Sequence, residues 1–206
     1  MMTWPNRITV LRILLLTPFL ALLINARDYP AMRYWALGVF AMMALCDALD
    51  GHLARRLDQR TRLGAILDPL ADKLVLTATV IALTSPHWLG EAERTAYHIP
   101  SWVTVTLLSK DGLILIGFLV LHVLTDRADL LHTTVLGKMA TAVTFALALA
   151  TLVAPDAARW TGWEQATVYA LHGLGALAAG LSAAACLDYI RLGSKHMAAH
   201  SGQEKV

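Results

Sequence analysis

The sequence predicts an all-α polytopic membrane protein with six transmembrane helices and both termini in the cytoplasm. Of its 206 residues, 57% are hydrophobic and 16% are charged, whereas soluble domains carry about 25% charged residues. The mean hydropathy of the chain is +0.55. This composition is typical of a protein whose outer surface meets membrane lipid. The net charge of +2 is too small to predict a nucleic-acid partner.

Six apolar runs are candidate membrane helices, because a helix that crosses the bilayer needs about 20 mostly apolar residues. The first run carries no convincing cleavage site for a signal peptidase, so it is expected to be retained. A membrane domain is predicted over residues 1–192, followed by a short polar C-terminal tail over 193–206. The predicted helices are Ile8–Ala26, Arg33–Asp47, Asp68–Ser85, Ile99–Thr125, Met139–Ala154 and Gln165–Leu187, with Asp188 at the end of the sixth.

The distribution of basic residues predicts the orientation of these helices. Eleven Lys and Arg residues fall on the side of the N-terminus, four fall on the opposite side, and Lys73 and Lys110 lie inside helices. Because basic residues concentrate in cytoplasmic loops, both termini and the segment Asp47–Asp72 are expected in the cytoplasm. The short chain without a transit peptide further suggests a multi-pass protein of a bacterial inner membrane, with its active site facing the cytoplasm. The four residues on the outer side are Arg27, Arg33, Arg94 and Arg159.

Four aspartates flank the link between the second and third predicted helices. Asp47 and Asp50 are spaced i, i+3, and Asp68 and Asp72 are spaced i, i+4, so each pair falls on one face of a helix. The uncharged run Tyr34–Cys46 has 13 residues and spans roughly 20 Å of a hydrocarbon core of about 30 Å. The second helix must therefore carry carboxylates to the membrane boundary.

Carboxylates gathered at a membrane boundary are costly and repel one another unless a cation neutralises them. Oxygen ligands select hard divalent ions such as Mg²⁺, Mn²⁺ or Ca²⁺. The alternative is that the aspartates cap helices or pair with nearby arginines, as is expected for Asp58 in the link. A cation-coupled transporter also remains an alternative, although the carboxylates cluster at one membrane face. Gly51 and Ala54 either clear a groove beside the carboxylates or allow close helix packing.

The acidic segment has the pattern Asp47-x2-Asp50-Gly51-x2-Ala54-Arg55-x8-Gly64-x3-Asp68-x3-Asp72, with eight specified residues over 26 positions. This pattern resembles the signature of the CDP-alcohol phosphatidyltransferase family. Two further elements are similar to the phosphatidylglycerophosphate synthase and cardiolipin synthase branches of that family. They are Pro5-Asn6-x2-Thr9-x2-Arg12 and Gly137-Lys138-x2-Thr141.

The resemblance implies an enzyme that transfers the phosphatidyl group of CDP-diacylglycerol to an alcohol with release of CMP. It further implies a two-metal site for Mg²⁺ or Mn²⁺, a homodimer and contact with membrane lipid. Asp72 would be the general base on the acceptor hydroxyl. The metal ligands would be Asp47, Asp50, Asp68 and Asp72, and the cytidine nucleotide would contact Asp50, Gly51, Ala54, Arg55, Gly64, Asn6 and Thr9.

The acceptor is predicted less directly, from basic residues that could bind a phosphate. Lys138 is expected near a helix N-terminus, which also favours anions. Phosphatidylglycerophosphate synthases usually carry a second lysine where this chain has Ala140, and the pair Lys110-Asp111 is closer to the cardiolipin synthase pattern. Glycerol 3-phosphate is favoured as acceptor, with phosphatidylglycerol as the alternative and other alcohols left open. The candidate acceptor-binding residues are Lys138, Lys110, Lys73 and Arg12.

Overall fold

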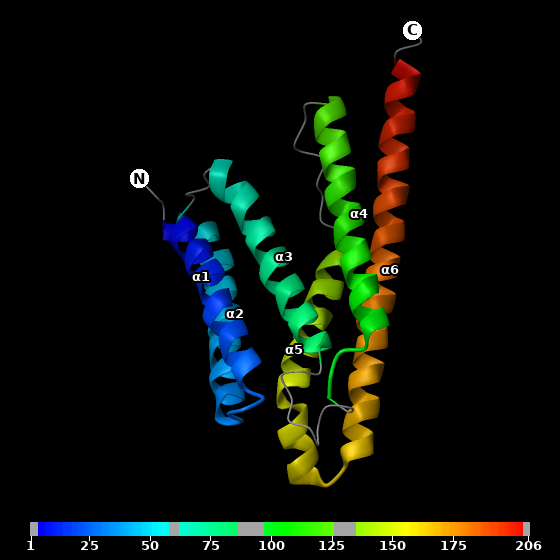
Figure 1. Cartoon of the computed structure of the whole chain (residues 1–206). Helices are drawn as coiled ribbons and strands as arrows, with labels where there is room; N and C mark the ends of the chain where they lie inside the picture. Colours follow the sequence, from blue (N-terminus) through cyan, green and yellow to red (C-terminus); the bar gives the residue numbers. More distant parts are fainter. Residues whose placement is uncertain (1–3, 58–61, 86–96, 126–134, 204–206) are drawn as a thin grey trace. The chain divides into compact units, whose positions relative to one another are not determined.

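A computed structural model shows an all-helical chain (Figure 1). It describes the backbone of residues 4–57, 62–85, 97–125 and 135–203. Side chains are described for residues 10–46, 71, 73–85, 97–114, 116 and 135–191. Within these ranges the helices are α1 (Trp4–Asn25), α2 (Ala31–Leu57), α3 (Arg62–Thr84), α4 (Ser101–Thr125), α5 (Val135–Thr161) and α6 (Glu164–Gln203).

The predicted all-α class is confirmed, and each predicted apolar run lies within or largely within one helix. Several helices are longer than their apolar runs. The predicted second helix ended near Asp47 and the sixth near Asp188, whereas α2 continues to Leu57 and α6 to Gln203. An apolar run measures the part of a helix that suits lipid. The backbone hydrogen bonds continue beyond it through alanine, leucine, arginine and lysine, which are good helix formers in water as well.

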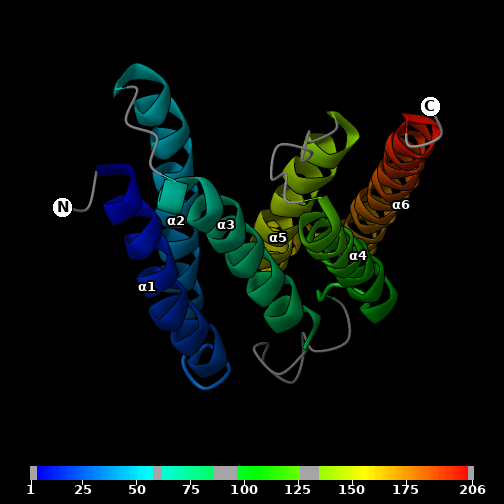
Figure 2. The same ribbon diagram turned by 90° about the horizontal axis from the view of Figure 1, so that it is seen from above.

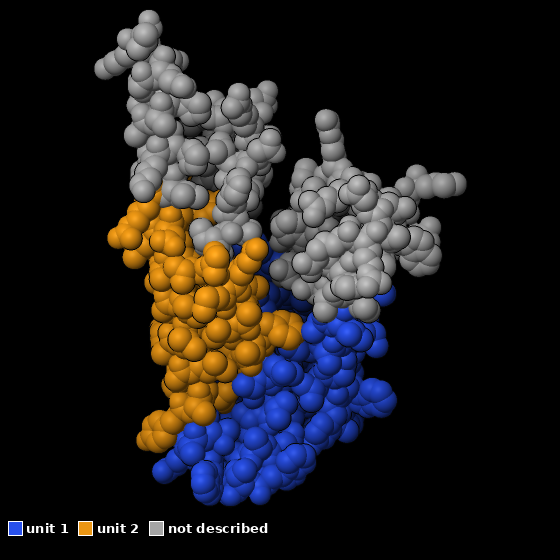
Figure 3. Space-filling view, turned by 180° about the vertical axis from the view of Figure 1, so that it is seen from behind, with its two compact units in different colours: residues 1–99, 148–168 blue, residues 100–147, 169–206 orange. Residues whose placement is uncertain are grey.

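The helices are distributed over two compact units (Figure 3). Unit 1 comprises residues 1–99 and 148–168, and therefore holds α1, α2, α3 and the second half of α5. Unit 2 comprises residues 100–147 and 169–206, and therefore holds α4, the first half of α5 and most of α6.

The core of unit 1 forms where α1 packs against both α2 and α3 (Figure 2). Phe19 of α1 and Phe40 of α2 are completely buried, and their ring centroids lie 5.6 Å apart with the ring planes tilted by 33°. Leu83 near the end of α3 is also fully buried. Aromatic pairs at this separation stabilise beyond the area that they bury. These contacts hold the three N-terminal helices together.

The outward faces of the helices are apolar too. Leu14, Ile24 and Trp35 are all well exposed, and a helix that is apolar on every face suits burial in lipid. Among the described residues, Val135–Thr161 and Glu164–Arg191 are long and apolar enough to cross a membrane. Val10–Asn25, Ala31–Cys46 and Lys73–Thr84 are shorter apolar helices. The chain has the character of a membrane protein, while six crossings and their orientation remain predictions.

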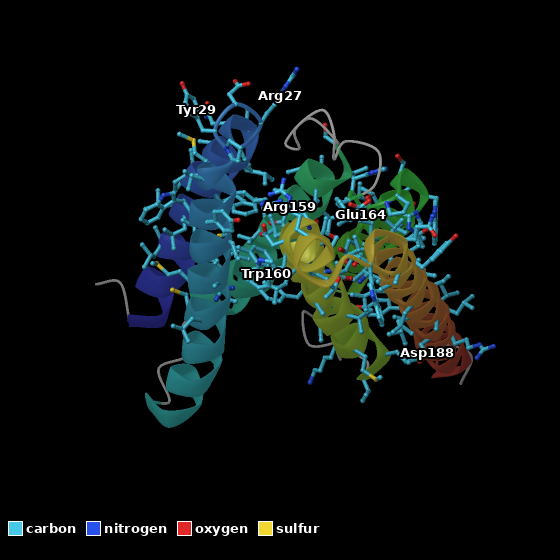
Figure 4. The ribbon with its side chains drawn as sticks, turned by 90° about the horizontal axis from the view of Figure 1, so that it is seen from below. Arg27, Tyr29, Arg159, Trp160, Glu164 and Asp188 are labelled. Atoms are coloured by element: carbon cyan, nitrogen blue, oxygen red, sulfur yellow. The ribbon has the colours of Figure 1, made fainter. Side chains whose placement is uncertain are left out.

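The turn between α5 and α6 depends on a glycine. Gly162 adopts a φ of 71°, which glycine reaches without the steric cost that a Cβ imposes. Its N–H donates to the carbonyl oxygen of Ala158 at 2.9 Å and closes the end of α5. Trp160 and Trp163 are exposed on either side of this turn (Figure 4 labels Trp160). Tryptophan at helix ends is typical of a membrane–water interface.

A buried ion pair joins α2 to α5 within unit 1. Arg33 Nη2 donates to Asp156 Oδ1 at 2.7 Å, and the Tyr34 hydroxyl donates to the same carboxylate oxygen at 2.9 Å. Arg33 is 7% exposed. The distribution of basic residues predicted that Arg33 is a charge of an outer loop. The structure instead gives it a partner 123 positions away in the chain.

Removing one member of this ion pair is predicted to destabilise the fold. Arg33→Met or Asp156→Asn alone leaves a buried charge without its partner, which costs about 3–5 kcal/mol. We expect a clear drop in the melting temperature of the detergent-solubilised protein. The double variant Arg33→Met/Asp156→Leu, with no charge at either position, should recover most of the loss. A double variant no more stable than the single ones would contradict this assignment.

Candidate functional site

The two aspartate pairs lie on α2 and α3, which run in opposite directions within unit 1 (Figure 1). α2 ends at Leu57 and α3 begins at Arg62. Five residue steps of at most about 3.6 Å bridge the two ends, which therefore lie within roughly 18 Å of each other. The chain itself brings the acidic segments of both helices to the same end of unit 1.

The distance along each helix places the aspartates in two layers. Asp50 lies seven residues before the end of α2 and Asp68 six residues after the start of α3, which is about 10.5 Å and 9 Å from the link at 1.5 Å per residue. Asp47 and Asp72 each lie ten residues from the link, about 15 Å along their helices. Each layer thus takes one aspartate from each helix.

The residues that the family resemblance assigns to the nucleotide also belong to unit 1. Gly51, Ala54 and Arg55 lie on the last turns of α2, and Gly64 lies on the first turn of α3. Asn6 and Thr9 are on the first turns of α1, which begins at the same end of the unit (Figure 1). The backbone therefore gathers these elements around the aspartate layers. The side chains of these residues and of the four aspartates are outside those that the structure describes.

The donor chemistry at this end of unit 1 fits a hard divalent cation. The four aspartates offer carboxylate oxygens from two helices at matched levels, and carboxylate oxygen is the ligand that Mg²⁺ and Mn²⁺ prefer. Among residues with described side chains, no three His, Cys, Asp or Glu residues gather closely enough to hold a metal. Because the four aspartates lie outside that set, the metal site remains a prediction from their spacing and helical placement.

Two of the basic candidates for acceptor binding lie in unit 1. Arg12 is buried on α1, and Lys73 is half-buried on α3 directly after Asp72. Neighbouring residues of a helix point about 100° apart, so Lys73 and Asp72 lie on different faces of α3. α1 packs against α2 and α3, the two helices that carry the aspartates. A buried arginine on α1 therefore belongs to the same helical group as the aspartates.

The other two basic candidates lie in unit 2. Lys110 of α4 is 7% exposed, and its Nζ lies 3.3 Å from Asp111 Oδ1. Lys138 is exposed on the first turns of α5. The Thr141 hydroxyl donates to the carbonyl oxygen of Gly137 at 3.0 Å, within the same helix. Charge alone predicted both lysines as acceptor-binding residues, but Lys110 is buried whereas Lys138 is exposed.

Two polar residues, one half-buried and one buried, were not predicted from the sequence as functional. Asp156 pairs with Arg33 and follows Pro155 inside α5. Ser182 of α6 is completely buried. Ser182 lies in an alanine-rich run of the sequence, and such a run by itself indicates only helix packing. The sequence signal for Ser182 was a polar residue inside this run. Residue spacing could not identify the helix that packs against it.

Metal binding provides a direct test of the aspartate layers. Asp50→Asn and Asp68→Asn each remove one ligand charge, and ligand charge sets the affinity of oxygen-ligand sites. We expect each substitution to weaken Mn²⁺ binding, measured by electron paramagnetic resonance of free Mn²⁺, by about tenfold or more. The matched control is Asp28→Asn, which changes an exposed carboxylate in the turn after α1. Wild-type affinity in both layer variants would exclude these aspartates as ligands.

Comparison with known proteins identifies relatives over much of the chain. The family model of the CDP-alcohol phosphatidyltransferases matches residues 2–171. A CDP-diacylglycerol–glycerol-3-phosphate 3-phosphatidyltransferase of Pseudomonas fluorescens is 46% identical over 91 residues, covering 43% of this chain and 46% of the relative. A probable phosphatidylglycerophosphate synthase of Mycobacterium tuberculosis is 32% identical over 151 residues, covering 73% and 65%.

A third relative belongs to the other branch that the sequence analysis considered. A CMP-forming cardiolipin synthase of Streptomyces coelicolor is 34% identical over 116 residues, covering 56% of this chain and 49% of the relative. The matched regions span about half to two thirds of the length of these three relatives. The family match covers most of the chain and includes α1, α2, α3 and the whole acidic segment. The chain belongs to the CDP-alcohol phosphatidyltransferase family.

Proposed function

We propose that this protein transfers the phosphatidyl group of CDP-diacylglycerol to an alcohol and releases CMP. The carrying observation is the eight-residue motif, whose aspartates lie at matched levels on two antiparallel helices joined by a short link. Membership of the phosphatidyltransferase family supports the same reaction. The reaction forms one phosphorus–oxygen bond to the acceptor and breaks the phosphorus–oxygen bond to CMP.

Asp47, Asp50, Asp68 and Asp72 would hold Mg²⁺ or Mn²⁺, in keeping with the general dependence of this family on divalent metals. When bound, such ions neutralise the pyrophosphate and the charge that develops on the leaving CMP. Phosphoryl-type transfer needs chiefly positioning and charge neutralisation. The protein's own contribution is therefore to present four carboxylates from fixed helical positions.

Asp72 is the proposed general base. It shares with Asp47 the layer farther from the link, about 15 Å along its helix. A base must lie within hydrogen-bond reach of the proton that it removes, so the acceptor hydroxyl would approach this layer. Asp72 would take the hydroxyl proton as the oxygen attacks phosphorus.

The nucleotide would lie along one face of α2. Asp47, Asp50, Gly51 and Ala54 are spaced i, i+3, i+4 and i+7, and these positions line one side of a helix. Small residues at such positions permit close approach of a ligand. Arg55 offers a cation for the nucleotide phosphates, and Gly64, Asn6 and Thr9 would complete the site from α3 and α1.

The proposed location is a bacterial inner membrane, with six crossings, both termini in the cytoplasm and the active site facing the cytoplasm. The excess of basic residues on the N-terminal side supports this orientation. Residues 1–192 would form the membrane domain and 193–206 the polar tail, whose first residues continue α6. A homodimer is proposed from the family resemblance. A site at the membrane boundary can receive both a lipid-anchored donor and a water-soluble nucleotide product.

Glycerol 3-phosphate is the acceptor that we favour, giving phosphatidylglycerophosphate. Relatives in Pseudomonas fluorescens and Mycobacterium tuberculosis carry names for this activity. Arg12, Lys73, Lys110 and Lys138 supply candidate cations for the acceptor phosphate. Phosphatidylglycerol, giving cardiolipin, is the second candidate. It is supported by the pair Lys110-Asp111, which resembles the cardiolipin synthase pattern, and by the similarity to a CMP-forming cardiolipin synthase.

The proposed reaction predicts metal-dependent CMP release by the purified protein. CDP-diacylglycerol with Mg²⁺ or Mn²⁺ and either glycerol 3-phosphate or phosphatidylglycerol should release CMP with one of the two acceptors. Asp72→Asn should lower kcat by about 10²–10⁴-fold, the usual contribution of a general base. Absence of CMP release with both acceptors, despite bound CDP-diacylglycerol, would move the acceptor to another alcohol. Failure to bind CDP-diacylglycerol at all would refute the proposal.

Lys138 provides a separate prediction about the acceptor. Lys138→Gln removes an exposed cation from the N-terminal turns of α5, where the helix dipole also favours an anion. We expect the KM for the acceptor to rise roughly tenfold while the KM for CDP-diacylglycerol stays within twofold. Arg159→Gln, at the last turn of the same helix, is the matched control and should change neither constant. Equal effects of both substitutions would indicate a nonspecific charge effect.

A further inference from the structure

We propose that Arg12 of α1 is the buried counter-ion of Asp47 of α2 within unit 1. Its guanidinium would hold the Asp47 carboxylate in place and balance its charge before a metal ion binds. This role rests on the transferase function proposed above, in which Asp47 is a metal ligand, and it adds a positioning residue to that site. A guanidinium bound to Asp47 would serve the metal site rather than the acceptor phosphate.

Arg12 is a charge buried inside an apolar helix. It is 4% exposed and lies within the apolar stretch Val10–Asn25 of α1. Arginine stays protonated in proteins, and a buried charge without a counter-charge is strongly destabilising. Arg12 therefore needs an anionic partner within reach of its side chain.

The acidic residues of unit 1 whose side chains are described do not meet this need. Asp28 and Glu164 are exposed, and Asp28 follows the far end of α1. Asp156 is bound by Arg33, close to the start of α2 and away from the acidic segment at its other end. The aspartates of that segment are the candidates that remain for pairing with Arg12.

The contact between α1 and α2 sets the register of these two helices. They run in opposite directions and are joined by a short turn (Figure 1). Phe19 of α1 and Phe40 of α2 are in contact, with ring centroids 5.6 Å apart. Because both helices rise by the same distance per residue, a step back along α1 matches an equal step forward along α2. Two turns, about seven residues, lead from Phe19 back to Arg12 and from Phe40 forward to Asp47.

The buried residues of both helices follow the same register. They are spaced by three and four positions, and such residues form one stripe along a helix. The buried residues between positions 10 and 26 are Arg12, Leu16, Phe19, Leu23 and Ala26, and those between 31 and 46 are Arg33, Ala36, Phe40 and Met43. Asp47 occupies the next position of the α2 stripe. Leu16 is level with Met43 in this register, and one step further Arg12 is level with Asp47.

The chemistry of an Arg12–Asp47 pair suits a site that must hold carboxylates close together. A guanidinium binds a carboxylate through two parallel N–H donors, which fixes the orientation of the carboxylate. Crowded carboxylates repel one another, and the guanidinium would offset one of the four charges while no metal is bound. Arg12 and a bound cation would share the Asp47 carboxylate, so each would weaken its attraction for the other.

Thermal unfolding of the metal-free full chain in detergent tests the pair. Arg12→Met should lower the melting temperature by about 6 °C or more, because it leaves Asp47 without its counter-ion. In the Asp47→Asn background the same substitution should lower it little or not at all. An equal decrease in both backgrounds would overturn the pair.

Arg33→Met is the matched control, since Arg33 is a second buried arginine of unit 1. It lies on α2 about 21 Å from Asp47 and binds Asp156. Its effect on the melting temperature should therefore be the same with and without Asp47→Asn. Arg12→Lys keeps the pair testable if Arg12→Met does not fold. Lysine retains the charge without the paired donors of arginine, so its smaller decrease should again depend on Asp47, and a decrease independent of Asp47 would overturn the pair.

Mn²⁺ binding distinguishes a counter-ion of Asp47 from an arginine that only supports the fold. Arg12→Met leaves one more carboxylate uncompensated, so it should tighten Mn²⁺ binding by about fivefold or more, measured by electron paramagnetic resonance of free Mn²⁺. Arg12→Lys, which keeps the charge, should bind Mn²⁺ as the wild type does. Unchanged or weaker binding in Arg12→Met would overturn the proposed role.

Neither measurement needs a substrate, so the pair and the proposed reaction can fail separately. Dependence of the Arg12→Met effect on Asp47, in a protein that releases no CMP, would support the pair and reject the transferase. CMP release by a protein that lacks this dependence would support the transferase and reject the pair.

Discussion

The short link between α2 and α3 is the constraint on which the candidate active site depends. Because four residues, 58–61, separate the two helices, the end of one and the start of the other must lie close together. The aspartates then fall into two layers by their distance from the link alone. Four carboxylates at a membrane boundary would repel one another, and the proposed divalent cation would neutralise them. Because the link is short, Gly51 and Ala54 of α2 and Gly64 of α3 lie at the same end of unit 1 as the aspartates.

The two units solve the problem of buried charge in different ways. In unit 1, Arg33 and Asp156 neutralise each other, and Tyr34 adds a second donor to the carboxylate. Such a fully paired group contributes to a unique arrangement of α2 and α5 and leaves little capacity for a ligand. In unit 2, Lys110 is buried and its Nζ lies 3.3 Å from Oδ1 of Asp111, its neighbour in the sequence.

A glycine on α6 shows how two helices of unit 2 approach each other closely. Gly175 allows α6 to approach Val103 of α4 closely, and this contact sets the register of the two helices. Lys110 and Ser182 each lie two turns further along their helices, and both are buried. Close packing in membranes usually relies on small residues. On α6 the buried stripe continues beyond Gly175 through Ala178 to Ser182.

The sequence alone determined the helical class, the family and the positions of the aspartates along α2 and α3. These follow from apolar run length and from spacing within a helix, which are properties of neighbouring residues. It underestimated the lengths of α2 and α6, because hydropathy measures contact with lipid rather than backbone hydrogen bonding. Only the tertiary structure decided that Arg33 meets Asp156 and that Gly175 of α6 lies against Val103 of α4. Such contacts join distant parts of the chain, and they depend on helix register, which spacing within one helix cannot specify.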